Sequence, residues 1–192
     1  MRVIAGQYRS RRLRSVPGTG LRPTADRLRE TLFNVLASGS VPLEGAGWLD
    51  LFAGSGAVGI EALSRGAAMV YFVESNPRAA AIIGANLASL AIGTRFEVIQ
   101  RDATEALRHL AHRDVRCSFC FLDPPWARTG EYQKVLAAIG DLPLIDEHGI
   151  AIAEHERHFD PGEQFGRLRR FRKLEQGDAV LSFYRNGGNV KC

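Results

Sequence analysis

The arrangement of hydrophobic and polar positions changes near residue 48. Before that point, short β-prone pieces flank a polar stretch within residues 2–16, which predicts a small hairpin or basic arm, and residues 17–20, Pro-Gly-Thr-Gly, interrupt it. Four hydrophobic residues then recur at helical spacing: Leu28, Leu32, Val35 and Leu36. They predict a helix that Thr24 caps and that ends near Ala37.

From residue 48 onward, short apolar runs alternate with helical patterns. The expected strands cover residues 48–52, 70–73, 96–99, 117–122 and 150–153. The expected helices cover residues 58–65, a segment opened by Asn76-Pro77, a segment from Asp102 to Leu110, and residues 132–139. Continuously apolar strands that alternate with helices are typical of a parallel sheet covered on both faces, and residues 168–174 and 179–184 predict a closing antiparallel hairpin.

Composition narrows the class of protein without identifying it. The chain has 192 residues, of which 45% are hydrophobic and 24% charged, as expected for one compact globular unit. No apolar stretch approaches the roughly 18 residues of a membrane span, and no signal-peptide core follows Met1. Three cysteines cannot build a disulfide framework. We therefore expect a cytoplasmic protein without membrane attachment.

Positive charge is concentrated at the beginning of the chain. The formal net charge is +4, whereas residues 1–30 alone carry +6 and the remaining residues −2. A local excess of arginine is typical of a segment that contacts nucleic acid. We accordingly divide the chain into a basic N-terminal extension, residues 1–40, and a catalytic domain, residues 41–192.

A glycine-rich turn follows the first expected strand of the sheet. Gly54, Gly56 and Gly59 fit the spacing G-x-G-x-x-G, and Glu74 stands twenty residues after Gly54, as in dinucleotide-binding sites. That spacing alone is weak, because any tight strand-to-helix turn favours glycine. Asp50 argues against a dinucleotide, since a carboxylate so near would repel a pyrophosphate.

A cationic cofactor fits these acids better. Asp50 suits the charged methionyl end of S-adenosylmethionine, Glu74 suits its ribose hydroxyls, and Asp102 suits the adenine amino group. All three follow strand carboxyl ends, where open α/β sheets bind ligands. Each taken singly is also explained as a helix cap, and Asp102 most readily.

The sequence Asp123-Pro124-Pro125-Trp126 follows the fourth expected strand. Two prolines stiffen the turn and remove N–H donors, which leaves the Asp123 carboxylate and the Pro124 carbonyl as acceptors for a planar NH2 group. The Trp126 ring offers a stacking face for a base turned out of its helix. Such acceptors would act by positioning and electrostatics rather than by covalent catalysis.

These motifs resemble the class I amino-methyltransferases that act on nucleobases. One family among them, the bacterial 16S rRNA (guanine-N2) methyltransferases, is resembled by the stretch Arg22-Pro23-Thr24-Ala25-Asp26-Arg27-Leu28-Arg29-Glu30-Thr31-Leu32-Phe33-Asn34 and by the basic arm from Gly6 to Leu13. Trp126 is a departure, since that family is expected to have Phe or Tyr there. The resemblance implies a Rossmann-like fold with a seven-stranded, mostly parallel sheet. It also implies methyl transfer from S-adenosylmethionine, leaving S-adenosylhomocysteine, to the N2 amine of a guanine in 16S rRNA.

The site residues expected on this basis form three groups. The catalytic group is Asp123, Pro124, Pro125 and Trp126. The cofactor group is Asp50, Phe52, Ala53, Gly54, Ser55, Gly56, Gly59, Glu74, Ser75, Asn76, Asp102 and Ala103. The RNA group is Arg9, Arg11, Arg12, Arg22, Thr24, Arg27 and Arg29. We expect a monomer that needs no metal and acts on the small ribosomal subunit or one of its assembly intermediates.

Three other features admit plainer explanations. Cys117 and Cys120 have C-x-x-C spacing within an expected strand, where they would point to opposite faces, so we expect buried free thiols. His155 and His158 are expected on the surface or rim beyond the fifth strand rather than at a metal. The basic run from Arg167 to Lys173 is explained equally well as a solvated edge strand and as additional RNA surface.

Other activities remain open on the residues alone. Adenine-N6 methylation of nucleic acid and glutamine-amide methylation of a protein both present a planar NH2 group to the same loop. A non-catalytic RNA-binding protein would have no need of the acceptor pair at Asp123 and Pro124. A dinucleotide-dependent oxidoreductase is disfavoured by Asp50.

Overall fold

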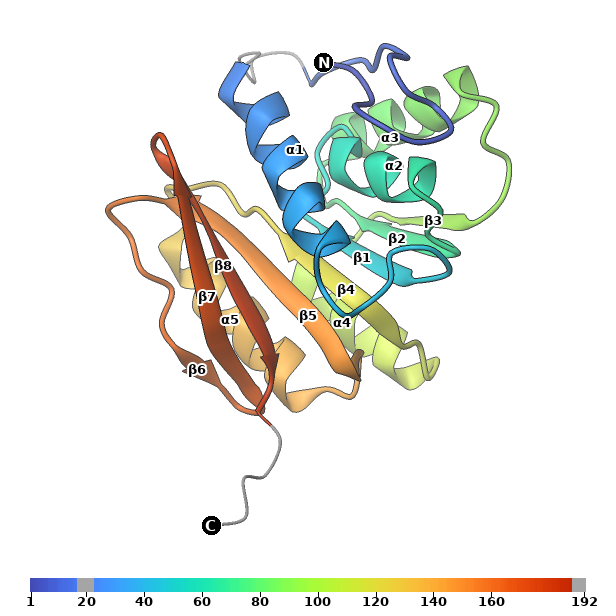
Figure 1. The fold of residues 1–192 in the computed structure, drawn as a ribbon. Coiled ribbons are helices and arrows are strands. Elements are labelled where there is room, and N and C mark those ends of the chain that lie inside the picture. The colour runs from blue at the N-terminus through green and yellow to red at the C-terminus, as the bar shows by residue number, and fades with distance from the viewer. Residues whose placement is uncertain (17–22, 188–192) are drawn as a thin grey trace.

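The computed structural model describes residues 1–16 and 23–187, which form one sheet with helices on both sides (Figure 1). The helices are α1 (Pro23–Ala37), α2 (Ala57–Ser64), α3 (Pro77–Ser89), α4 (Ala103–His112) and α5 (Thr129–Asp141). The strands are β1 (Gly47–Leu51), β2 (Met69–Val73), β3 (Phe96–Ile99), β4 (Cys117–Leu122), β5 (Ile145–Glu156), β6 (Gln164–Phe165), β7 (Leu168–Gln176) and β8 (Ala179–Asn186).

The sheet confirms the expected α/β architecture. Its order is β3-β2-β1-β4-β5-β8-β7-β6; β1 to β5 run parallel, whereas β8, β7 and β6 pair in antiparallel fashion. The predicted seven strands were one too few, because the two-residue strand β6 pairs with the start of β7. So short a strand has no hydrophobic alternation that a sequence could display.

Two hydrophobic clusters fill the two sides of the sheet. The first cluster holds Trp48 and Phe119 beneath α1, α2 and α3, and the second holds Leu49 and Leu122 beneath α4 and α5. Because neighbouring residues of a strand point to opposite faces, the apolar run Trp48-Leu49 supplies both clusters. This explains why most residues of the strands β1 to β4 are hydrophobic.

The N-terminal arm, residues 1–16, is the small hairpin that the sequence predicted. Arg2 and Arg12 form an antiparallel bridge, and the Val3 amide donates to the Arg11 carbonyl at 2.9 Å. Val3 and Leu13 are buried in the first cluster together with the apolar face of α1. The arm therefore shares one core with the sheet and its helices. Division into residues 1–40 and 41–192 stays a prediction.

Every predicted element is present; β1 and α2 are displaced by one residue at both ends, and larger differences occur in α1, β5 and α5. Helix α1 begins at Pro23, so Thr24 lies in its first turn and not at the cap position. Strand β5 starts five residues earlier than the expected residue 150, because Ile145 already pairs with Cys117 before the register against β4 shifts. Helix α5 extends the expected 132–139 by three residues at its start and two at its end.

The two cysteines of β4 are buried and free, as predicted. Burial raises the pKa of the Cys117 thiol to about 12 and that of Cys120 well above its usual value. The prediction that they point to opposite faces was wrong, since both belong to the second cluster. The β4–β5 register shifts between Cys117 and Phe119, so simple alternation does not hold at the start of the strand.

Candidate functional site

The turn between β1 and α2 has a backbone that few residues other than glycine adopt. Gly54 and Gly56 have φ values of 56° and 78°, and Phe52 has 58°. The Gly56 amide donates to the Ala53 carbonyl at 2.7 Å, which closes the turn directly before the helix. The expected cofactor residues from Phe52 to Gly56 therefore form a tight loop at the carboxyl edge of the sheet.

The third glycine of the motif sets the distance between helix and sheet. A Cβ atom on Gly59 would lie 2.3 Å from the ring of Phe72, so no side chain fits there. The close approach also lets the Gly59 amide donate to Asp50 Oδ2 at 2.9 Å. Gly59 is thus tied to β1 by its backbone as well as packed against β2.

Asp50 is buried at the end of β1, with only 1% of its surface exposed. Burial, and repulsion from Asp123 and Glu74, raise its pKa to about 8 although the Gly59 amide favours the ionised form. No lysine or arginine of the described ranges, residues 1–16 and 23–187, forms an ion pair with Asp50 or Glu74. Asp50 is therefore shifted towards its protonated form, and its ionised form has no partner cation within those ranges.

Glu74 joins the second strand to the glycine loop. Its Oε2 accepts from the Gly54 amide at 2.9 Å, and its Oε1 accepts from the Asn76 amide at 2.8 Å. The Asn76 side chain caps α3 by accepting from the amides of Arg78 and Ala79, as the Asn-Pro sequence predicted. Ser75, between them, is exposed.

Asp102 acts as the cap of α4. Its Oδ1 accepts from the Thr104 hydroxyl and from the amides of Thr104 and Glu105, and the Thr104 bond holds the Asp102 pKa below its usual value. The side chain remains exposed beyond the end of β3, and Ala103 is buried as the first helical residue. The structure thus confirms the cap, and a cofactor contact stays a prediction.

The loop after β4 lies at the same edge as these acids. Pro124 is buried, Pro125 is exposed, and Trp126 is half-buried against the first cluster. The Tyr132 hydroxyl lies 2.9 Å from the Glu154 carbonyl, to which it donates, and 3.4 Å from the Pro124 carbonyl. Tyr132 therefore connects the loop to β5, a role that no feature of the sequence signalled.

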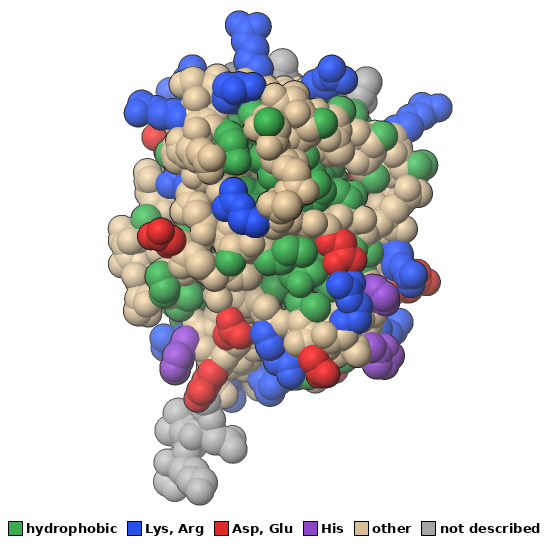
Figure 2. All heavy atoms as spheres, turned by 90° about the vertical axis from the view of Figure 1, so that its right-hand side faces the viewer, with side chains coloured by type: hydrophobic (Ala, Val, Ile, Leu, Met, Phe, Trp, Pro, Cys, Tyr) green, Lys and Arg blue, Asp and Glu red, His purple; other side chains and the backbone are tan. Residues whose placement is uncertain are grey.

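The candidate RNA residues fall into three groups: those that are exposed, those outside the described residues, and Arg29, which is buried. Arg9, Arg12 and Arg27 are exposed, and Arg11 is exposed while its guanidinium donates to the Ser89 carbonyl at 2.9 Å. Figure 2 shows basic side chains along the upper part of the face on which Figure 1 places the arm. Arg22 and the side chain of Thr24 lie outside the described residues.

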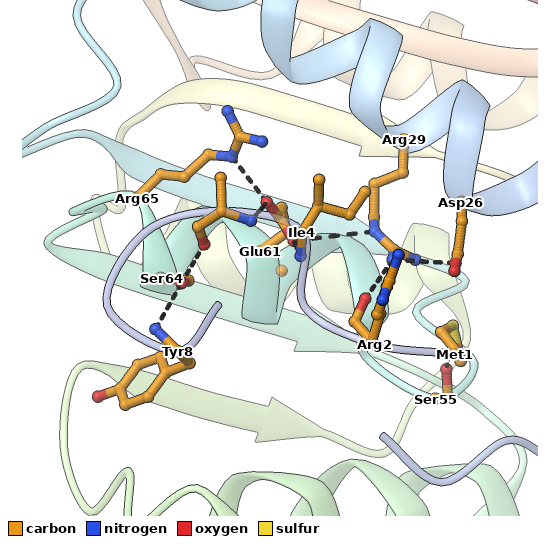
Figure 3. Close-up of polar contacts among 12 residues, drawn as sticks. Met1, Arg2, Ile4, Tyr8, Asp26, Arg29, Ser55, Glu61, Ser64 and Arg65 are labelled. Atoms are coloured by element: carbon orange, nitrogen blue, oxygen red, sulfur yellow. Dashed lines mark hydrogen bonds and ion pairs between the residues drawn. The ribbon is translucent and has the colours of Figure 1, made fainter. Parts of the chain in front are cut away.

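Arg29 was wrongly placed among the RNA contacts. It is 5% exposed, and its guanidinium donates to the Arg2 carbonyl at 2.6 Å and to Asp26 at 3.1 Å. Its Nε also lies 4.0 Å from Glu61. From α1, the Arg29 side chain holds the arm through its hydrogen bond to Arg2, so its guanidinium is buried and not available to RNA (Figure 3).

Glu61 is the residue of this region that the sequence did not single out. It is fully buried, yet its carboxylate accepts from the amides of Ile4 and Ala5 at 2.7 and 2.9 Å and from Arg65 at 2.8 Å (Figure 3). A lone acid in the otherwise apolar and small helix Ala57–Ser64 was the available signal, since a buried charge requires partners.

Asn86 of α3 connects the arm to the glycine loop. Its amide nitrogen donates to the carbonyls of Ser55 at 2.9 Å and Arg14 at 3.1 Å, and its oxygen accepts from the Arg14 amide at 2.8 Å. The basic arm is therefore fixed to the loop that follows β1.

His155 also departs from expectation. It is buried, with Nε2 2.9 Å from the Ser182 hydroxyl and Nδ1 3.0 Å from the Glu156 carbonyl, and burial lowers its pKa. The surface placement was wrong for His155 and correct for His158, which is exposed. Within the described ranges, no three His, Cys, Asp or Glu side chains are grouped as a metal site requires. Every helix there is also too short or too polar to span a bilayer.

The sheet order, the glycine loop and the acids at successive strand ends define the class I methyltransferase fold. The chain is similar over 97% of its length to a solved structure titled "Putative methyltransferase yhhF from Escherichia coli", with 32% identity, 97% of that chain covered and a TM-score of 0.79. The architecture implied by the sequence resemblance is thereby confirmed.

A family model described as "Conserved hypothetical protein 95" matches residues 1–185, and the chain belongs to this family. It is 36% identical to "Putative rRNA methyltransferase YlbH" of Bacillus subtilis over 98% of this chain and 100% of the relative. It is 38% identical to "Ribosomal RNA small subunit methyltransferase D" of Escherichia coli over 81% of this chain and 75% of the relative. These matches confirm the family that the sequence motifs suggested.

Proposed function

We propose that this protein transfers a methyl group from S-adenosylmethionine to the exocyclic N2 amine of a guanine in 16S rRNA. The observation that carries the proposal is the buried carboxyl group of Asp50 beside Glu74 and the glycine loop: burial raises its pKa to about 8, and no cation of residues 1–16 or 23–187 forms an ion pair with it. A carboxylate kept out of water without a counter-ion favours a cationic ligand over a pyrophosphate. Supporting it, the curated relatives bear names of rRNA methyltransferases.

The residues at the carboxyl edge fit S-adenosylmethionine. Asp50 would offset the positive charge of its methionyl part, and the loop from Gly54 to Gly56 would allow its close approach. Glu74 has one lone-pair direction on each oxygen satisfied by the amides of Gly54 and Asn76, which leaves capacity for the ribose hydroxyls. The bound cofactor supplies an electrophilic methyl group.

The loop after β4 is suited to an aromatic amine. The lone pair of such an amine is delocalised into the ring, so it attacks poorly until acceptors hold it. The Asp123 carboxylate and the Pro124 carbonyl would accept its two N–H bonds while the base stacks on Trp126. The amine would lose one proton when it takes the methyl group, and the Asp123 carboxylate would accept that proton, while S-adenosylhomocysteine would be the leaving group.

Two variants test the assignment of roles. Asp123→Ala is expected to reduce methyl transfer by about a hundred- to a thousandfold, because it removes an acceptor that acts mainly in the transition state, and to leave cofactor affinity within a few-fold. Glu74→Ala is expected to weaken cofactor binding. Calorimetric titration measures affinity, and transfer of a radiolabelled methyl group to small-subunit RNA measures activity. Loss of cofactor binding in Asp123→Ala would contradict this division of roles between the two acids.

The target is tested in cells. Small-subunit RNA from a strain lacking this protein should lose one N2-methylguanine, and the purified protein should restore it. Restoration of a methylated adenine, or transfer to a protein glutamine, would replace the guanine assignment while keeping the methyltransferase. Absence of any transfer, with RNA binding retained, would favour the non-catalytic alternative.

A further inference from the structure

The sequence did not decide whether the basic run from Arg167 to Lys173 contacts RNA. The structure divides its cations into two sets, according to whether each has a partner within the protein. The first set is engaged inside the protein. Arg170 pairs with Asp160 and Glu163, and Lys173 pairs with Asp160 at 3.4 Å. Arg167 donates to the carbonyls of Gly140 and Leu142 at 3.0 and 2.8 Å. These three cations are explained by the fold.

The second set consists of Arg169 and Arg172, joined by Arg185 of β8. All three are exposed, and none forms an ion pair with a carboxylate of residues 1–16 or 23–187. Arg169 stands directly opposite Arg185 in the antiparallel pair. Like charges at directly opposed positions destabilise a sheet, so this arrangement has a cost that the fold alone does not explain.

Phe171 lies among these arginines. It is the extra residue where the β7–β8 register shifts, and it is the only large hydrophobic side chain exposed in the described part of the chain, at 44%. The Arg185 guanidinium lies 5.1 Å from the Phe171 ring centroid, and the Arg172 guanidinium lies 5.9 Å from that of Phe183. The strand therefore presents an aromatic ring flanked by positive charge, on a face of β7 that no ribbon covers in Figure 1.

We propose that this hairpin surface, made of Arg169, Phe171, Arg172 and Arg185, binds a single-stranded segment of the RNA substrate outside the catalytic pocket. The inference rests on the proposed function, since it assumes an RNA substrate. Phosphates would offset the opposed charges of Arg169 and Arg185, and a base would stack on Phe171. Unpaired guanidinium groups beside an exposed ring are the combination that single-stranded nucleic acid recruits.

The location makes this a second contact rather than part of the pocket. Strand β7 is separated from β4, which carries the Asp123 loop, by β5 and β8. Three strand spacings amount to about 14 Å across the sheet. A nucleotide held on the hairpin surface is therefore not the methylated one. A second copy of this chain is a poor occupant, because two such surfaces would bring positive charges together.

The test compares charge-matched variants in binding to protein-free 16S rRNA. Arg169→Gln/Arg185→Gln removes two charges from the hairpin surface, and Arg108→Gln/Arg116→Gln removes two exposed charges from the α4 side as the control. Phe171→Leu keeps an apolar side chain but removes the stacking ring. Filter binding at several salt concentrations gives the affinity and its salt dependence for each protein, and the melting temperature checks folding.

The hairpin double variant should bind about tenfold more weakly at low salt and show a salt slope reduced by roughly 1.4, for two lost phosphate contacts. Phe171→Leu should weaken binding about tenfold with the slope unchanged. Without RNA, the double variant should melt within about 1–3 °C of wild type, because the relief of the Arg169–Arg185 repulsion and the loss of the Arg185–Phe171 contact oppose each other. The control pair should leave affinity and slope at the wild-type values.

Wild-type affinity and slope in the hairpin double variant would overturn the proposal, as would an equal loss in the control. A dimer seen by sedimentation that dissociates in the double variant would assign the surface to self-association and also overturn it. These outcomes are separate from methyl transfer. A protein that binds RNA through the hairpin surface but methylates no RNA would refute the proposed function alone.

Discussion

Glu61 and Asp50 are both buried carboxylates that accept from backbone amides, and their surroundings differ in one respect. Glu61 lies 2.8 Å from Arg65 and 4.0 Å from Arg29, so its charge is offset within the fold. Asp50 has the Gly59 amide as a partner but faces repulsion from Asp123 and Glu74. A buried acid paired with cations, such as Glu61, anchors the fold, whereas Asp50, buried beside other acids, is where we propose that a ligand supplies the positive charge.

The largest effect is expected at the anchor. Glu61→Gln should lower the free energy of unfolding by about 3–5 kcal/mol, because Arg29 is left buried without its full counter-charge. Urea denaturation followed by circular dichroism measures the change. Glu30→Gln, an exposed position on α1 with the same change of charge, serves as the control. Equal stabilities of the two variants would remove the distinction between anchor and ligand site.

Asp50→Asn should behave in the opposite way. The ligand-free protein should be no less stable than wild type, because a carboxyl group with a raised pKa is replaced by a neutral amide. Affinity for S-adenosylmethionine should fall about ten- to a hundredfold, because this range corresponds to the free energy of a hydrogen bond or ion pair to a charged group. Calorimetric titration and a melting curve on one preparation test both statements. A strongly destabilised variant would show that Asp50 too is mainly structural.

The pH dependence follows from the same carboxyl group. In the ligand-free fold the pKa of Asp50 is about 8, against 3.8 for the ordinary group. Between these values the folded protein holds one more proton than the unfolded chain, so this group's contribution lowers stability as the pH rises from about 4 to 8. A cationic ligand requires the ionised form, so affinity for S-adenosylmethionine should rise up to about tenfold per pH unit and level off near 8. Asp50→Asn should abolish that rise.

The smallest effect concerns the arm that Glu61 anchors. Arg9→Ala/Arg12→Ala should weaken RNA binding several-fold and reduce its salt slope by roughly 1.4, with cofactor affinity unchanged. Arg11 is left in place because it already donates to the Ser89 carbonyl. The Arg108/Arg116 pair again supplies the charge-matched control. An unchanged slope would make the arm a purely structural hairpin.

The sequence was sufficient where one local rule decides the structure. Short runs made mostly of apolar residues located β3 and β4 at their observed bounds, and the glycine spacing located the turn after β1. Asn76 before Pro77 identified the start of α3. Each of these depends on neighbours a few residues away, which a sequence displays directly.

The errors concern partners that are distant along the chain. Arg29 is buried because Glu61, thirty-two residues later, offsets its charge, and His155 is buried because Ser182 reaches its Nε2. Desolvating such groups is costly unless the fold supplies the partner, and the sequence does not say which partner that is. Tyr132 was missed for the same reason, since its hydroxyl bonds to backbone carbonyls that have no signature in the sequence.

The two buried thiols of β4 can report, by their reactivity, how often the fold opens and exposes the central sheet. Only the thiolate reacts with alkylating reagents, and with their pKa values raised Cys117 and Cys120 are shielded twice, by burial and by protonation. Their labelling rate therefore measures how often the central sheet exposes itself to solvent. After replacement of Cys192 by serine, pulsed alkylation would show whether a bound ligand slows that exposure, without any added probe.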